Sequence, residues 1–441
     1  MSVPGVSARQ AVLDALDRIA AARGLNAFTE VLADRALARA ALVDRGAVRG
    51  PLAGVPFAVK NLFDVAGLAT RAGSAINRAR PPAIADAQAI RRLEAAGAIL
   101  VGTLNMGEYA YDFTGENSHD GACRNPHDPA CMTGGSSSGS GAAVAAGLVP
   151  IALGSDTNGS IRVPASLCGV FGLKPTYGRL SRAGTFPFVS SLDHVGPLAR
   201  TAAALVLAYN AMQGWDPADP VCADRPMEPV QASGIGGLRI AVAGGYFEEN
   251  AGPEARAAVQ AAAAALGVTA GVEVPQAGRA RAAAYVITTV EGAALHLDRL
   301  RTQPEGFDPD VRDRLIAGAM VPGAYYARAQ RFRRWYRDQV LALFGSVDAI
   351  LAAATPCPAP LIGQKTMQLG GETVPVRASL GVLTQPISFI GLPVVAVPVP
   401  GIGLPVGVQI VAAPWREDVA LRIACYLEAQ GAAVSRPVPS A

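Results

Sequence analysis

The sequence is poor in charged and aromatic residues. Only 17% of its 441 residues are Asp, Glu, Lys or Arg, and 6% are aromatic, whereas 51% are hydrophobic. That much apolar material can bury a large core, which excludes a disordered chain. Basic residues (38) nearly balance acidic ones (35), and no run of five basic side chains occurs, so we expect no nucleic-acid partner.

Long apolar runs are also missing. The longest, around residues 142–153 and 392–399, are interrupted by Gly or Pro and are shorter than the roughly 18 residues that a membrane span needs. The N-terminus lacks the basic segment and apolar stretch of a signal peptide. We therefore expect no membrane association and a cytoplasmic location.

Cysteine and histidine are scarce. There are four histidines and six cysteines, none of them in a CxxC pair, and this spacing fits neither a disulfide framework nor a zinc site. We expect reduced thiols, no metal and no cofactor. Cys123 and Cys131 flank a loop before the most unusual segment, and we interpret them as small buried hydrophobes rather than redox groups.

Apolar spacing predicts short strands that alternate with helices, which indicates an α/β fold. No internal repeat and no long polar linker divides the chain. The expected strands cover residues 54–59, 98–102, 149–153, 238–243, 349–353, 394–399 and 407–411, and the expected helices cover 7–23, 33–43, 85–97, 142–148, 253–266, 309–344 and 417–429.

Two segments are unusually rich in Ser and Gly. A long polar loop over residues 115–135 leads into Gly-Gly-Ser-Ser-Ser-Gly-Ser-Gly at 134–141, and a second hydroxyl-rich segment covers 154–162. A phosphate-binding loop would need a lysine after its last glycine, but Ser140 follows Gly139, so we disfavour that interpretation.

A nucleophile elbow, Gly-x-Ser-x-Gly, matches formally with Ser137 in the middle. An elbow must directly follow a buried strand, however, and residues 129–133 are predicted to be a loop. Its base would be His194 or His296, and both lie beside apolar residues, where a structural histidine is the commoner explanation.

A third interpretation needs no histidine. Lys60 ends a predicted buried strand, which is an unusual place for a lysine. Burial lowers a lysine pKa, and a neutral lysine can activate a serine directly or through a second serine that relays the proton. The two hydroxyl-rich segments and Lys60 together therefore predict a Ser, Ser, Lys arrangement.

The segments 134–144, 154–165 and 172–181 resemble the amidase signature hydrolases, and the resemblance extends from about residue 12 to 429. It implies an α/β fold in which helices cover both faces of a central mixed β-sheet. It also implies one domain over residues 1–441, with a catalytic core at about 54–200 and a substrate-pocket and C-terminal part at about 238–430.

The resemblance assigns roles residue by residue. It implies Ser160 as the nucleophile, Ser136 as the bridging serine and Lys60 as the base, with a cis peptide bond between Gly135 and Ser136. An oxyanion hole would come from the backbone N–H groups of Thr157, Asn158, Gly159 and Ser160, and structural support from Ser137, Asp156 and Arg162.

One position departs from the family pattern: Asn158 stands where the family usually has glycine. If this position needs a positive φ, asparagine is the least costly replacement. We also expect its amide to reach the substrate pocket. A noncatalytic scaffold is the alternative, and the retention of Lys60, Ser136 and Ser160 argues against it.

Asn158 and the stretches 113–121, 312–318, 328–336 and 385–393 are similar to a subgroup of this family. That subgroup deaminates a small, planar, anionic urea derivative and works with a small helical protein that resembles the amidotransferase C subunit. The resemblance therefore implies an amidohydrolase in a hetero-oligomer.

An anionic substrate calls for a guanidinium, because a planar carboxylate accepts two parallel N–H bonds from arginine. Arg314 is the leading candidate. The alternative for any arginine between residues 312 and 337 is that it lies on a solvent-exposed helix face and contacts no substrate. The competing activities are the glutaminase subunit of a tRNA-dependent amidotransferase and a general amidase of small amides.

Overall fold

The computed structural model describes residues 6–231, 234–401, 403–436 and 438. Its strands are β1 (Phe28–Val31), β2 (Pro56–Lys60), β3 (Ile99–Leu104), β4 (Arg124–Asn125), β5 (Asp128–Met132), β6 (Ile151–Asp156), β7 (Phe171–Lys174), β8 (His194–Ala199), β9 (Ile240–Ala243), β10 (Gly271–Val272), β11 (Ala349–Ala353), β12 (Thr366–Leu369), β13 (Glu372–Pro375), β14 (Val394–Val399) and β15 (Val406–Ala412).

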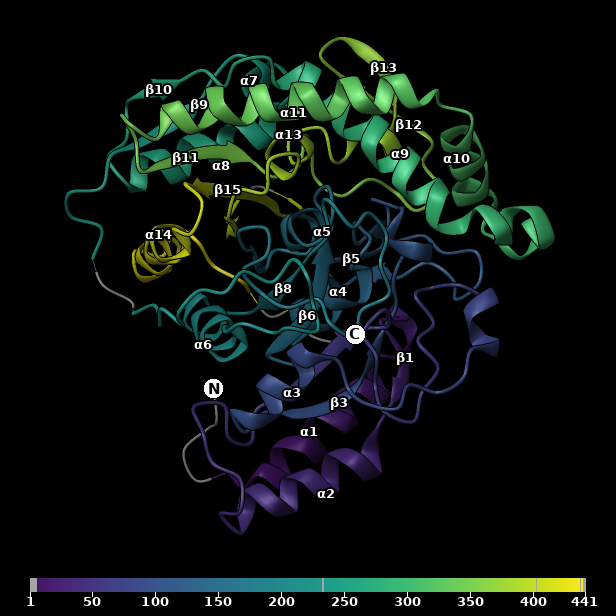
Figure 1. The fold of residues 1–441 in the computed structure, drawn as a ribbon. Coiled ribbons are helices and arrows are strands. Elements are labelled where there is room, and N and C mark those ends of the chain that lie inside the picture. Colours follow the sequence, from purple (N-terminus) through teal and green to yellow (C-terminus); the bar gives the residue numbers. More distant parts are fainter. Residues whose placement is uncertain (1–5, 232–233, 402, 437, 439–441) are drawn as a thin grey trace.

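The α-helices are α1 (Ala8–Ala21), α2 (Ala33–Asp44), α3 (Gln88–Ala95), α4 (Ser138–Ala145), α5 (Arg162–Leu167), α6 (Ala202–Met212), α7 (Tyr246–Glu249), α8 (Pro253–Ala265), α9 (Ala277–Thr302), α10 (Pro309–Ala319), α11 (Gly323–Leu343), α12 (Val376–Ser379), α13 (Gln385–Ser388) and α14 (Glu417–Ala429). Short 3-10 helices are η1 (Arg23–Leu25), η2 (Ile76–Ala79), η3 (Glu108–Ala110) and η4 (Pro304–Gly306). Figure 1 shows α1 and α2 at the base of the molecule and α9, α10 and α11 across its top.

An 11-stranded mixed sheet runs through the centre, in the order β1-β3-β2-β6-β8-β7-β14-β15-β11-β9-β10 (Figure 1). Strands β3, β2 and β6 are parallel, and the pairs from β6 to β11 are antiparallel. The predicted α/β fold with a central mixed sheet is therefore confirmed.

The central strands are buried on both faces. In β2, Phe57 and Val59 belong to one hydrophobic core, which includes residues of α3, α6 and α14, whereas Ala58 belongs to a second core with residues of α1, α2 and α4. Successive side chains of a strand point to opposite faces of its sheet. Helices therefore cover both faces, and this explains why these strands read as continuous apolar runs.

Several predicted elements match the structure closely, namely the strands at 349–353 and 394–399 and the helix at 417–429. Others differ. The helix expected at 142–148 begins earlier, at Ser138, and the loop expected at 115–135 contains the β4–β5 hairpin. The serines enter α4 because their hydroxyls find backbone partners: Ser138 donates to the carbonyl of Asn105 and Ser140 to that of Leu153.

The direction of β2 and β6 brings the unusual segments together. The two strands are parallel, with Val59 opposite Leu153, so Lys60 and Asp156 reach the same edge of the sheet. Helix α4 packs on both strands. Among the described residues no helix combines the length and hydropathy that crossing a membrane demands.

Candidate active site

Lys60 is completely buried at the end of β2. Its Nζ atom lies 2.7 Å from Ser136 Oγ and 2.8 Å from Ser155 Oγ. Burial lowers the pKa of the Lys60 ammonium from 10.5 to about 7, against the opposing influence of the Asp156, Asp193 and Asp112 carboxylates. A lysine in this site can exchange protons with a serine near neutral pH.

The two hydroxyl-rich segments are held side by side. The Ser137 hydroxyl donates to the carbonyl of Ser155 at 3.1 Å, and the Ser137 N–H donates to the carbonyl of Ser160 at 3.3 Å. The peptide bond between Gly135 and Ser136 is cis, as the sequence resemblance implies. Ser137 thus links the segment that carries Ser136 to the segment that carries Ser160.

Ser155 is a site residue that the sequence reasoning missed. It lies one residue before the end of β6, and its hydroxyl is the second hydrogen-bond partner of Lys60. Ser155 could have been found from the parallel pairing of β2 and β6, because this pairing places residues near the C-terminal ends of both strands together. No hydrogen bond joins the Ser136 and Ser160 hydroxyls in the described part of the chain.

Ser160 lies in the turn between β6 and α5, and it is buried but faces a cavity. Within the residues that the structure describes, no protein group accepts from the N–H groups of Thr157, Asn158, Gly159 and Ser160. Such free donors suit a developing oxyanion. Thr157 lines the same cavity, and its hydroxyl donates to Asp193 at 2.6 Å.

Gly159 and Thr384 explain the shape of this turn. Gly159 has a φ of 144°, and a Cβ atom there would lie 2.1 Å from Thr384 Oγ1. Thr384 approaches this closely because its hydroxyl donates to the carbonyl of Asn158 at 2.7 Å. Asn158 itself is not among the residues with positive φ, so the backbone does not require a glycine-like residue there.

Asp156 and Arg162 form a buried ion pair across the turn. Arg162 Nε and Nη2 each lie 3.0 Å from an oxygen of Asp156, and both side chains are fully buried. Arg162 Nη1 also donates to Gln409 Oε1 at 2.6 Å, and Asp156 accepts the N–H of Ile161 at 3.2 Å. The pair therefore anchors the turn to β15.

The cavity beside Ser160 has a volume of about 230 Å³. Its lining combines aromatic side chains with a few polar groups, as small-molecule sites do. The lining residues include Tyr111, Phe113, Asn158, Ser160, Phe188, Tyr285, Thr288, Arg314, Arg377 and Gln385.

Two arginines line the cavity, and their partners differ. Arg377 pairs with Asp112 and with Asp310, at 3.1 Å from the latter, so its charge is compensated. Arg314 has no carboxylate partner among the described residues: it donates to two backbone carbonyls, and its guanidinium lies 4.0 Å from the centroid of the Tyr111 ring. Arg314 is therefore the guanidinium available to an anion.

The structure gives no support to a nucleophile elbow at Ser137. The hydroxyl of Ser137 bonds to the backbone of Ser155 and not to a histidine. His194 Nδ1 lies 3.0 Å from the carbonyl of Asp156, and His296 is buried against the ring of Tyr109 at 4.0 Å. Burial lowers the pKa of both histidines, to about 3 for His296.

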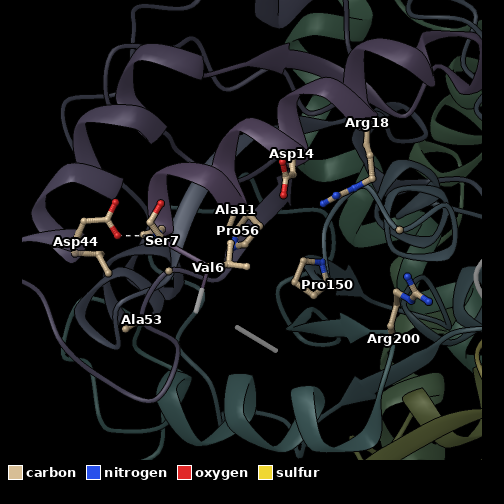
Figure 2. Close-up of a pocket in the computed structure, with 14 residues that line it drawn as sticks. Val6, Ser7, Ala11, Asp14, Arg18, Asp44, Ala53, Pro56, Pro150 and Arg200 are labelled. Atoms are coloured by element: carbon tan, nitrogen blue, oxygen red, sulfur yellow. Dashed lines mark hydrogen bonds between the residues drawn. The ribbon is translucent and has the colours of Figure 1, made fainter. Parts of the chain in front are cut away.

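A separate groove of about 590 Å³ lies between α1, α2 and the sheet (Figure 2). Of its lining residues, Pro56 is the first residue of β2 and Pro150 directly precedes β6, so this groove is at the opposite end of the strands from Lys60. Its serine, Ser7, caps α1 by accepting from the N–H of Gln10. The groove contains no pairing of a serine with a lysine.

Comparison with known proteins gives a consistent result. A family model described as amidase matches residues 10–421. The AtzE subunit of 1-carboxybiuret hydrolase from Pseudomonas sp. (strain ADP) is 57% identical, covering 97% of this chain and 96% of that protein. A glutamyl-tRNA(Gln) amidotransferase subunit of Chloroflexus aurantiacus is 39% identical, covering 90% and 88%.

Solved structures agree with the sequence matches. One, described as a vestigial protein complex that reveals the evolutionary origins of an s-triazine catabolic enzyme, superposes with a TM-score of 0.96 at 56% identity, covering 98% of this chain and 97% of that one. A 6-aminohexanoate cyclic dimer hydrolase bound to its substrate superposes with a TM-score of 0.88 at 28% identity, covering 99% and 96%.

Proposed function

The chain belongs to the amidase signature family, and from this premise we propose that it hydrolyses a small anionic urea-type amide through Ser160, Ser136 and Lys60. The observation that carries the proposal is the fully buried Lys60 amine, 2.7 Å from Ser136 and next to the turn that bears Ser160. The family hydrolyses C–N bonds of amides, so the reaction class is an amidohydrolase.

The proposed reaction forms an acyl-enzyme. Neutral Lys60 accepts the proton of Ser136, which accepts the proton of Ser160 as Ser160 Oγ attacks the amide carbonyl. The N–H groups of Thr157, Asn158, Gly159 and Ser160 stabilise the oxyanion. The relay then runs in reverse: Ser136 donates one proton to the amide nitrogen, which leaves as ammonia, and recovers its own proton from Lys60. Water then hydrolyses the acyl-enzyme, and Ser160 regains its proton.

The proposed substrate is 1-carboxybiuret or a close analogue, which would yield a dicarboxylated urea and ammonia. The support is the 57% identity to the AtzE protein over nearly the whole chain. Arg314 supplies a guanidinium without a carboxylate partner among the described residues, and the buried hydroxyl of Tyr111 likewise has no hydrogen-bond partner there. Both line the cavity and suit a substrate carboxylate.

We also propose a small helical partner protein, because one structural neighbour comes from a protein complex. Met320, directly after α10, and Tyr325, in the first turn of α11, expose 77% and 55% of their surface, and a partner could cover such apolar side chains. Coexpression with a C-subunit-like protein should raise solubility or activity. Full activity and monodisperse behaviour of the chain alone would argue for a self-sufficient amidase.

The function is tested by ammonia release from 1-carboxybiuret, biuret, allophanate and glutamine, with any copurifying partner present. We expect the carboxylated urea to be the best substrate. Arg314→Met should raise its KM, whereas Arg312→Met is the matched control, since Arg312 pairs with the exposed Asp313 on the same helix. Preference for glutamine would instead favour the glutaminase role in a tRNA-dependent amidotransferase.

A further inference from the structure

Asn158 has a buried oxygen atom with no partner. Its Nδ2 donates to Thr288 Oγ1 at 2.8 Å, but its Oδ1 has no hydrogen-bond partner among the described residues. The residue is only 6% exposed and lines the cavity together with Ser160 and Thr288. Because a buried carbonyl oxygen without a donor is unfavourable, this atom is suited to accept from a bound substrate.

Two threonines fix the position of Asn158. Thr384 donates to its backbone carbonyl at 2.7 Å, and Thr288, on α9, holds its amide nitrogen. Thr384 thus fixes the backbone of Asn158 and Thr288 fixes its side chain, which leaves Oδ1 as the side-chain atom without a partner among the described residues. Asn158 is also two residues before Ser160, in the turn whose N–H groups are free to bind the substrate carbonyl oxygen.

We propose, on the basis of the function proposed above, that Asn158 Oδ1 accepts a hydrogen bond from a ureido N–H of the substrate. In a urea-type amide, R–NH–CO–NH₂, the atom on the acyl side of the attacked carbonyl is an N–H donor. In an ordinary carboxamide, R–CH₂–CO–NH₂, it is a methylene, which leaves Oδ1 buried and unpaired. Asn158 thereby selects urea-type amides, and Thr288 acts as its positioning residue.

The size of the preference for urea-type amides follows from the hydrogen bond to Asn158 Oδ1 that a carboxamide cannot make. Sites built to bond a substrate N–H discriminate strongly against analogues that lack it, because the protein group stays desolvated and unpaired. For one neutral hydrogen bond we expect a preference of about 10-fold to 100-fold in kcat/KM. Substituting glycine at Asn158 removes the acceptor and should abolish this preference.

The test compares N-carbamoylglycine with succinamate, which carry the same carboxylate and differ only in NH versus CH₂ beside the reacting carbonyl. The ratio of their kcat/KM values is measured in wild type, Asn158→Gly and Thr288→Val. Using the change in this ratio cancels the different intrinsic reactivity of the two amides. We expect the ratio to fall about 10-fold to 100-fold in Asn158→Gly and by less in Thr288→Val.

The matched control is Thr289→Val, because among the described residues the Thr289 hydroxyl bonds only to the backbone carbonyls of Tyr285 and Val286 within its own helix. Its ratio should stay at the wild-type value. An unchanged ratio in both Asn158→Gly and Thr288→Val would overturn the inference and leave the amidase function intact.

If the enzyme hydrolyses neither N-carbamoylglycine nor succinamate, labelling of Ser160 distinguishes two explanations. If a serine-reactive probe still labels Ser160, the catalytic serine is active, and the inferred ureido recognition is wrong. If Ser160 is not labelled, the proposed function itself fails.

Discussion

Replacing Lys60 with methionine removes the buried amine and retains a side chain of similar length. Burial lowers the pKa of Lys60 from 10.5 to about 7, which corresponds to about 5 kcal/mol at about 1.4 kcal/mol per pH unit. Below about pH 7, Lys60 is protonated in both the folded and the unfolded state, so the full cost of burying its charge opposes folding. It fades as pH rises toward the unfolded pKa, because the unfolded state then also loses its proton.

The substitution also removes the hydrogen-bond partner of Ser136 and Ser155, at a cost of about 1 kcal/mol each. Lys60→Met should therefore be inactive yet more stable than wild type by roughly 3 kcal/mol near neutral pH. Between about pH 7 and about pH 9.5 this advantage should shrink by about 3 kcal/mol, whatever the two hydroxyls contribute.

Urea unfolding followed by circular dichroism at these two pH values measures the difference directly. The pH trend serves as its own control, because the hydroxyl contributions do not titrate in this range. A Lys60→Met protein that is several kcal/mol less stable than wild type near neutral pH would refute the reasoning, since Lys60 would then be charged and favourably paired.

Other consequences of the site are open to measurement. The kcat/KM should rise with pH through about 7, as Lys60 loses its proton, and a flat profile over pH 6 to 9 would contradict this. Ser155→Ala should lower kcat about 10-fold without abolishing probe labelling, because Lys60 keeps Ser136. Arg314→Met should raise KM about 10-fold for carboxylated ureas but not for neutral biuret, measured by ammonia release. Asp156→Asn should lower the free energy of unfolding by about 3 to 5 kcal/mol in urea titrations, because it leaves Arg162 charged and unpaired in the core.

Much of the central sheet could be predicted from the sequence. Its strands are apolar runs because both faces are buried, and the strand at 394–399 and the closing helix at 417–429 have the bounds that the pattern indicates. The start of α4 could not be predicted this way. Ser138 and Ser140 are polar in sequence, but in the fold they donate to carbonyls of Asn105 and Leu153 from distant segments.

The site could be predicted only in part, because some of its residues carry a local sequence signal and others depend on contacts between distant segments. Lys60 at a strand end was a local signal, and the family resemblance supplied Ser136 and Ser160. The roles of Ser155 and Thr288 depend on contacts across 95 and 130 positions of sequence, which only the fold creates. The expectation that Asn158 replaces glycine for backbone reasons does not apply, because its φ is not positive and its amide instead meets Thr288.

The central claim is that Ser160 is the nucleophile, and covalent labelling tests it most directly. The protein, with any copurifying partner, is treated with a fluorophosphonate probe, and the modified peptide is identified by mass spectrometry. We expect one adduct on Ser160, no adduct in Ser160→Ala, and a loss of ammonia release of more than about a thousandfold in that variant. An adduct on Ser137, or near-normal ammonia release by Ser160→Ala, would contradict the account.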